Sequence, residues 1–396
     1  MSKKRSERNT KAFKKVAPQT TRGSLITDIC NLAILATREI ENGNGYTEDS
    51  PDALLSFVVK SYLDSGQEHI IISSMEKLMD SGQVQPAMLL DSIADALSDS
   101  ISSVDINESN IYADVEEVAI DTHLFIIPMM LHYESNPTVG RTAAINSTEL
   151  RKCLTDSLLL DAADFVNDGI EVAVSPFLYT VENLPVSFTD RRKFIAHISE
   201  YQAQQEQEPT PSSTQANVLL RFMAFTVKGD ADYLDGCAIV NPELLLSTDD
   251  ETDSPYAESL ANFSAGFSKL IQQRNPQIFV ASASFPDRLR DGISTGVTLW
   301  NGMSLHLVLA KFDETGEKPD KAYFDFVEIS DIAEIHIAIH SKGKRVDAKW
   351  IIMDGDFESA AESIMNILSA KGITDIYMPA EEPASIANSP RGIRLH

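Results

Sequence analysis

The spacing of apolar residues changes once along this chain, and that change constrains the fold more than any other feature. From residue 23 to residue 103 apolar side chains recur every three or four positions, as in Leu25, Ile29 and Leu32, which is typical of amphipathic helices. Helices are expected at about 25–36, 50–62, 68–80 and 86–100. Because the connections are short, residues 23–103 are predicted to form a helical region, either an antiparallel bundle or an array of helical hairpins.

After about residue 115 the apolar residues come in dense or alternating runs, which indicates strands. The run Thr122–Tyr133 predicts a buried strand that Pro128 makes irregular or places near an edge. A helix from Ser147 to about residue 167, a strand at 170–174 and a helix from Asp190 follow. Residues 104–201 are therefore predicted to form an α/β unit in an order typical of parallel strand pairing.

A polar stretch with two prolines, residues 202–216, predicts a flexible linker before a second α/β unit at 217–378. Strands are expected at 218–227, 237–240, 277–283, 303–312, 322–329, 333–340, 346–353 and 373–378, and helices at 254–273, 286–300 and 356–371. In the strand at 333–340 isoleucines alternate with polar residues, so one face is predicted to be buried and the other wet. The chain is thus assigned to the mixed α/β (α+β) class, with tails at 1–22 and 379–396.

The two α/β units share short sequence features at corresponding places. Val174-Ser175-Pro176 and Asp190-Arg191-Arg192 in the first unit compare with Ser284-Phe285-Pro286 and Asp287-Arg288 in the second. Each set follows a strand, a long helix and a second strand. We therefore hypothesise that the second unit is a duplication of the first.

Charge is distributed very unevenly over the chain. The formal net charge is −26, yet the first 22 residues hold eight cations and one carboxylate, a net +7 that leaves −33 on the rest. The cations of this tail are Lys3, Lys4, Arg5, Arg8, Lys11, Lys14, Lys15 and Arg22. Such an acidic body repels nucleic acids and anionic membranes, so contact with a polyanion is expected only at the tail or at a local patch.

Three interpretations of the basic tail stay open. It is a disordered arm without a partner, a partner-binding segment that docks on RNA or on an acidic protein surface, or an arm that folds back onto its own acidic body. The residues assigned to partner binding are Lys3, Lys4, Arg5, Arg8, Lys11, Lys14 and Lys15.

Cysteine usage and hydropathy predict a cytoplasmic protein with no membrane segment. Cys30, Cys153 and Cys237 are odd in number and far apart, which fits reduced core residues better than disulfides or a metal site. The longest apolar run, 124–131, contains a proline and is too short to cross a bilayer.

One short motif raises the possibility of catalysis. Residues Gly292 to Gly296 match the GxSxG pattern of a nucleophile elbow, with Ser294 as the candidate nucleophile and His306, His336 and His340 downstream. That chemistry needs the serine on a tight strand-to-helix turn, whereas the pattern of helices places Ser294 inside a helix. Ser294 is therefore only a weak catalytic candidate.

No pattern predicts a cofactor or a metal. His336 and His340 share one face of a strand but lie about 13 Å apart along it, too far to bind one ion together. The acidic run 249–253 lacks the glycine and the late glutamate of an EF-hand loop. Phosphate-binding glycine motifs are missing from the sequence, so we expect neither cofactor nor metal.

One stretch carries a family resemblance. The strand Phe125 to Tyr133, the helix Thr148 to Leu160, and the segment from Pro176-Phe177 to Leu184-Pro185 together resemble an uncharacterised bacterial family of cytoplasmic proteins of roughly 400 residues. The resemblance covers about 60 residues and implies a bacterial cytoplasmic protein, without implying an activity.

Two functional hypotheses follow. The first is a non-catalytic interaction or regulatory protein with macromolecular partners, a protein or an RNA, bound through the tail. The second is an enzyme with a cleft between the two α/β units. The reaction class named for it is hydrolysis, with Ser294 as the nucleophile.

Overall fold

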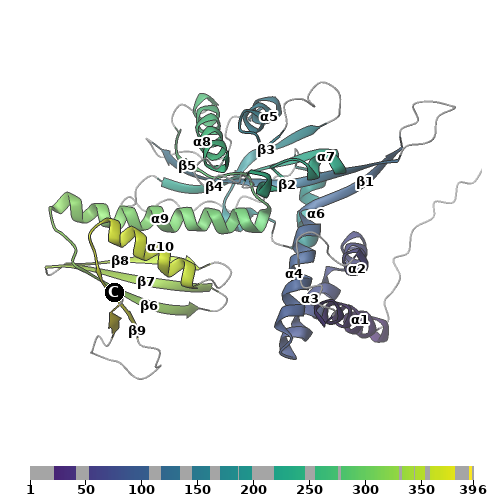
Figure 1. Cartoon of the computed structure of the whole chain (residues 1–396), viewed down its shortest axis with the longest axis horizontal. Coiled ribbons are helices and arrows are strands. Elements are labelled where there is room, and N and C mark those ends of the chain that lie inside the picture. The colour runs from purple at the N-terminus through teal and green to yellow at the C-terminus, as the bar shows by residue number, and fades with distance from the viewer. Residues whose placement is uncertain are drawn as a thin grey trace, which may run out of the picture. The chain divides into compact units, whose positions relative to one another are not determined.

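A computed structural model describes most of the chain (Figure 1), and the chain divides into two compact units between Leu97 and Ser98. The described residues are 22–41, 53–106, 117–133, 145–160, 170–185, 187–198, 218–245, 255–274, 278–329, 332–342, 344–352, 357–379 and 392–394. The basic residues assigned to the tail before Arg22, the stretch 202–216 and the acidic run 249–253 lie outside them.

The first unit is helical, as the periodicity of its apolar residues predicts. Its helices are α1 (Arg22–Glu41), α2 (Ala53–Asp64), α3 (Glu68–Asp80) and α4 (Val84–Ser98). The apolar stripes meet in a core that includes Leu32, Leu55 and Ile70. Gly66 and Gly82 have positive φ in the turns after α2 and α3, a conformation that lets glycine end a helix at little cost.

The second unit begins with an antiparallel sheet, called sheet A. Its strands are β1 (Ser100–Ile106), β2 (Glu117–Tyr133), β3 (Glu171–Tyr179), β4 (Val218–Asp230) and β5 (Ile278–Ala283). Their order is β1-β2-β4-β3, and β5 pairs with β2 beyond the end of β1. Every pairing in sheet A is antiparallel.

This topology corrects the predicted parallel pairing. The strands that were expected to pair, β2 and β3, do not touch as neighbours because β4 lies between them. The strand β4 is apolar along most of its length, so it needs a neighbour on each edge and cover on each face. Residues on both sides of 202–216 therefore share one sheet, and the two predicted α/β units are not separate at this point.

Helices cover both faces of sheet A (Figure 1). One face packs on α5 (Ser147–Asp156), α7 (Ala231–Asp235) and α8 (Pro255–Arg274), and the other on α6 (Phe188–Ala196) and the start of α9 (Leu289–Thr315). Along β2, Phe125 and Ile127 face the first group whereas Leu124 and Ile126 face the second. Two 3₁₀ turns add to these layers, η3 (Pro242–Leu245) on the first face and η2 (Val181–Asn183) on the second. The strand predicted at 237–240 is instead the turn after α7.

Sheet A is built from two halves with the same order of elements. The first half runs β2, α5, β3, α6, and the second runs β4, α8, β5, α9, with the short helix α7 added between β4 and α8. The short strand of each half pairs with the long strand of the other, β3 with β4 and β5 with β2. The order of elements supports the duplication hypothesis, and the exchange of short strands locks the halves together.

A buried carboxylate ties α6 and α9 to this sheet. Asp99 accepts a hydrogen bond from the backbone N–H of Leu289 at 2.9 Å and pairs with Arg191 of α6 at 3.4 Å. The side chains of Asp99 and Arg191 are both buried. A negative charge at the first turn of a helix is favourable, and each buried ion here offsets the desolvation cost of the other.

The second unit also contains sheet B. Its strands are β6 (Lys321–Ile329), β7 (Ile332–Ser341), β8 (Lys344–Ile352), β9 (Asp375–Pro379) and β10 (Gly392–Arg394), in the order β10-β9-β6-β7-β8. Only β6 and β9 pair in parallel, and α10 (Phe357–Ala370) makes the crossover between β8 and β9. The second half of α9 and all of α10 lie on one face of sheet B (Figure 1).

The prediction of a strand at 303–312 is wrong, because α9 continues through these residues to Thr315. Its sequence alternates like a strand, but Leu305, Leu309 and Phe312 also recur at helical spacing. Those three side chains are buried against sheet B, and that burial decides between the two patterns. His306, expected on a strand beside His336, therefore lies on a helix.

Close packing along α9 gives a test of this fold. A Cβ on Gly296 would come within 2.5 Å of the buried ring of Phe222, whereas one on Gly302 would meet nothing closer than 4.0 Å. We expect Gly296→Ala to lower the free energy of unfolding by about 1–3 kcal/mol through overpacking. Gly302→Ala should raise it by up to about 1 kcal/mol through helix propensity. Urea denaturation of both variants measures the difference, and equal effects would contradict the packing of α9 on sheet A.

Candidate functional site

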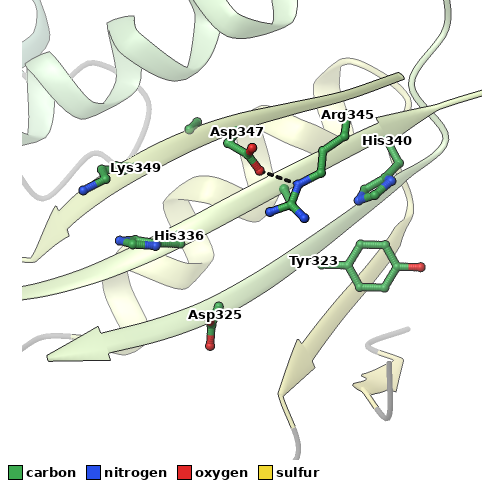
Figure 2. Close-up of a pocket in the computed structure, with 9 residues that line it drawn as sticks. Tyr323, Asp325, His336, His340, Arg345, Asp347 and Lys349 are labelled. Atoms are coloured by element: carbon green, nitrogen blue, oxygen red, sulfur yellow. Dashed lines mark hydrogen bonds and ion pairs between the residues drawn. The ribbon is translucent and has the colours of Figure 1, made fainter. Parts of the chain in front are cut away.

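The candidate site is the face of sheet B opposite α9 and α10, which none of the described helices covers. On β7 the side chains of Ile335, Ile337 and Ile339 are buried under α9 and α10. The side chains between them, His336, Ala338 and His340, lie on the opposite face, as the alternation predicts. Polar side chains of β6 and β8 flank them on both sides (Figure 2).

Strand register arranges nine residues of this face as three rows of three. Asp325, His336 and Lys349 form one row, Tyr323, Ala338 and Asp347 the next, and Lys321, His340 and Arg345 the third. Alanine is the smallest of the nine and occupies the centre, so eight longer polar side chains surround a low floor. We call this hollow the basin.

The basin has a volume of about 620 Å³. Its lining comprises Tyr323, Asp325, His336, Ala338, His340, Arg345, Asp347, Ala348 and Lys349. That volume falls within the range of ligand-binding pockets, although the basin is open on one side. The sequence singled out only His336 and His340 among these residues, because the register between three strands cannot be read from one strand's alternation.

An ion pair fixes one wall of the basin. The Nε of Arg345 donates a hydrogen bond to the Oδ1 of Asp347 at 2.7 Å. Both side chains are well exposed, and Figure 2 shows the guanidinium leaning from β8 over the middle strand. Asp347 therefore holds the guanidinium by one edge and leaves the terminal nitrogens directed into the basin.

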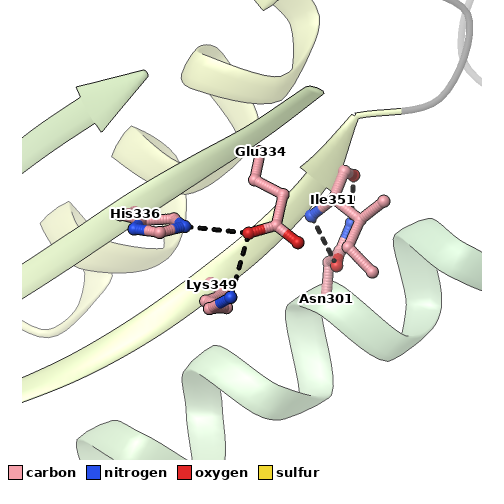
Figure 3. A network of polar contacts seen from close by, with 5 residues as sticks. All are labelled: Asn301, Glu334, His336, Lys349 and Ile351. Carbon is pink, nitrogen blue, oxygen red and sulfur yellow. Dashed lines mark hydrogen bonds and ion pairs between the residues drawn. The ribbon is translucent and has the colours of Figure 1, made fainter. Parts of the chain in front are cut away.

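A three-residue network fixes the opposite end (Figure 3). The Oε2 of Glu334 lies 2.8 Å from the Nε2 of His336 and 3.1 Å from the Nζ of Lys349. The hydrogen bonds from His336 and then Lys349 hold the pKa of Glu334 below its usual value. The lining residues His336 and Lys349 are thus positioned by a carboxylate that lies just outside the basin.

Aromatic rings close the third side. The ring of Tyr323 stacks on Tyr377 of β9 with centroids 5.0 Å apart and an interplanar angle of 15°. The ring of His340 meets Tyr323 at 5.1 Å and 77°. These contacts restrict the rotamers of Tyr323 and His340, so the wall is ordered before any ligand arrives.

Asp325 and Lys321 differ from the other charged residues of the grid. Neither side chain makes a hydrogen bond or an ion pair with another residue in the described part of the chain. Together the segment 321–352 contains five lysines and arginines and five carboxylates. It is therefore neutral, in a chain whose net charge is −26.

The edge of β8 next to this face is capped by a side chain of α9. The amide of Asn301 donates to the carbonyl of Ile351 at 2.7 Å and accepts from its N–H at 3.1 Å (Figure 3). Both bonds imitate those of a neighbouring strand, which protects an edge from pairing with another chain. Because Asn301 occupies the backbone groups of Ile351, a ligand cannot pair with the edge of β8 there, and the open face of sheet B remains for binding.

The structure does not assemble a catalytic site around Ser294. Ser294 lies in the second turn of α9 and not on a strand-to-helix turn, as the helical pattern indicated. His306 is twelve residues further along the same helix, about 18 Å away. His336 and His340 lie on the face of sheet B that points away from α9.

A second group of titratable side chains lies around β2 of sheet A, where His123 pairs with β1 and β4 and Asp287 bridges to Ile126. Burial, and then the charge of Arg288, lower the pKa of His123 to about 4, while burial and the charge of Asp291 raise the pKa of Asp287 to about 6. The Nε2 of His123 is buried and has no hydrogen-bond partner in the structure. His123 is therefore neutral at physiological pH and packs against Phe125.

The described residues form neither a metal-ligand cluster nor a membrane-spanning helix, and the cysteines are free thiols. No group of three or more His, Cys, Asp or Glu within the described ranges is placed to hold a metal ion. The three cysteines form no disulfide; Cys153 and Cys237 are buried and Cys30 is half-buried. None of the described helices is long and apolar enough to cross a membrane.

Comparison with known proteins gives no match. No protein-family model, curated protein or solved structure is significantly similar to this chain. The resemblance to a bacterial family thus remains a prediction.

The Glu334 network makes a prediction about pH. A carboxylate whose pKa is lowered on folding stabilises the protein above its unfolded pKa, near 4.5, and loses that effect as the pH falls through the folded value. We expect Glu334→Gln to reduce the free energy of unfolding at pH 7 by less than about 1 kcal/mol, since its partners are exposed. The deficit should vanish on acidification below the folded pKa. Glu362→Gln, an exposed control on α10, should show no such pH dependence in the same urea titrations.

Proposed function

We propose that this chain is a non-catalytic interaction protein whose basin on sheet B binds a segment of a protein partner. The observation that carries the proposal is the grid of eight polar side chains around Ala338 on a face without helical cover. Tyrosine and arginine, the residues most enriched in the energetic centres of protein interfaces, both line the basin.

The charge of the basin favours a protein over a nucleic acid. A nucleic-acid site gains most of its affinity by neutralising several phosphates with lysine and arginine. Here Asp325, Asp347 and Glu334 accompany the cations, and the surrounding chain is strongly acidic. A mixed-charge surface is suited to a protein segment that itself carries both signs.

The chemistry of the lining supports binding more than catalysis. The basin has imidazoles and carboxylates but no serine, threonine or cysteine that an acyl-transfer reaction could use as a nucleophile. The lysine, arginine and histidine side chains at its walls are mostly engaged with neighbouring carboxylates or rings. Such pairing orders a recognition surface at a low cost on binding.

The basic tail supplies a second contact in this proposal. The chain has a cationic end in addition to a neutral basin and an acidic remainder; its cations are Lys3, Lys4, Arg5, Arg8, Lys11, Lys14 and Lys15. A cationic arm accelerates encounter with an acidic protein or an RNA and adds salt-sensitive affinity. Three cysteines without disulfides fit a cytoplasmic location for this association.

Filling the basin tests the proposal. Ala338→Leu places a bulky side chain on the floor without removing a charge, and Val327→Leu makes a similar change on the same face of β6 outside the lining. A partner is first isolated from lysate of the source organism, treated with nuclease, and purified. Calorimetry with the purified partner should then give at least about tenfold weaker binding for Ala338→Leu and unchanged binding for Val327→Leu. Equal affinities for wild type and Ala338→Leu, or loss of the partner on nuclease treatment, would refute the proposal.

Deletion of the tail gives an independent test. Removing residues 1–21 leaves Arg22 as the first residue of α1, so the circular dichroism spectrum and melting temperature should stay close to those of the full chain. The association rate with the same partner should fall, and its dependence on salt between about 50 and 200 mM should flatten. A salt dependence equal to that of the full chain would assign the tail no role in binding.

A further inference from the structure

Some charged side chains of the basin already have hydrogen-bond partners within the protein and others do not. The side chains without partners indicate which groups a ligand should carry. Lys349 and His336 are both held by Glu334. Arg345 is held only through Nε, and Asp325 has no partner among the described residues. Two corner residues that line the basin therefore remain available for a ligand, one cationic and one anionic; the third unpaired corner residue, Lys321, lies outside the lining.

The cationic corner is shaped for a carboxylate. A guanidinium has five N–H donors in one plane, and Asp347 uses the single donor on Nε of Arg345. The remaining edge matches the two oxygens of a carboxylate in a bidentate pair. Because Asp347 already fixes the plane, a carboxylate meets an oriented guanidinium, not a mobile one.

The anionic corner lies diagonally opposite. Asp325 is on β6 in the row of His336, while Arg345 is on β8 in the row of His340. The carboxylate of Asp325 is exposed and accepts hydrogen bonds only. It is therefore complementary to an ammonium or a guanidinium on the ligand.

Sheet geometry sets the distance between the two corners. They are two strand spacings apart, about 10 Å, and four residues apart along the strands, about 13 Å, which gives a diagonal of about 16 Å. An extended chain rises about 3.3 Å per residue and places alternate side chains on the same face, so residues four apart, about 13 Å between Cα atoms, direct both side chains at the basin. The length of the side chains covers the rest of the diagonal. Ala338 lies between the corners and leaves room for the side chains between them.

We infer that the basin recognises an extended protein segment in which an acidic and a basic residue lie four positions apart, the acid on Arg345 and the base on Asp325. This inference rests on the proposed function and specifies its ligand. A multiply charged anion such as an RNA backbone satisfies Arg345 but is repelled by Asp325, Asp347 and Glu334. A segment with both charges satisfies both corners.

Peptide selection is the first arm of the test. Random peptides of about nine residues, displayed on phage, are selected on the full-length wild-type protein and counter-selected on Ala338→Leu. Enriched peptides should carry an acidic and a basic residue at the inferred separation. Enrichment of peptides without such a pair would overturn the inference, as would basin-dependent binding of a labelled oligouridine RNA.

Charge exchange is the second arm, measured by fluorescence anisotropy with a selected peptide. Asp325→Lys and Arg345→Glu should each weaken binding at least about tenfold. Reversing the matching charge on the peptide should restore affinity to within about threefold for its own variant and not for the other. Glu362→Lys and Lys371→Glu make the same charge changes on the helical side of the domain and should leave binding unchanged.

The outcomes separate this inference from the proposed function. If Ala338→Leu abolishes peptide binding but the charge exchanges neither weaken nor restore it, the basin binds by other chemistry and the inference is wrong. If no peptide distinguishes wild type from Ala338→Leu, the proposed binding role of the basin fails as well. Circular dichroism of each variant confirms that a loss of binding is not a loss of fold.

Discussion

The second unit depends on the two-sided packing of one helix, α9. At 27 residues it is about 40 Å long, and its two halves belong to different cores. Gly292 and Gly296 bring the first half against Ile126 and Phe222 of sheet A, while Leu305, Leu309 and Phe312 bury the second half in sheet B. Asp99 satisfies a backbone N–H at its start, and Gly316 ends it in a left-handed conformation.

The position of α9 also explains why the basin exists. A sheet with one apolar face needs that face covered, and α9 with α10 covers the isoleucine face of β7. The other face is exposed to water, and its polar side chains form hydrogen bonds and ring contacts with one another. They do so through Glu334, Asp347 and the stacked tyrosines, which leaves an ordered ring of polar groups around an alanine. The side chains suited to binding a ligand thus lie on the face of sheet B that does not pack in the hydrophobic core.

Sequence patterns predicted most elements but not their partners. The four helices of the first unit and the burial of β7 follow from local periodicity, which needs no tertiary information. The path of α9 through residues 303–312 was missed because its apolar residues fit both periods until burial selects one. The position of β4 between β2 and β3, and the nine-residue grid, depend on strand register, which is set by contacts between residues far apart in sequence.

The exchange of short strands between the halves of sheet A has a consequence for biosynthesis. When β2 leaves the ribosome, the strands that will flank most of its length, β4 and β5, are still about one hundred residues or more behind it. Only β1 is ready to pair at that moment. The edges of a long apolar strand must therefore wait, unpaired, for most of the chain to be translated. Slow translation or chaperone protection through that interval favours the native sheet over pairing between nascent chains.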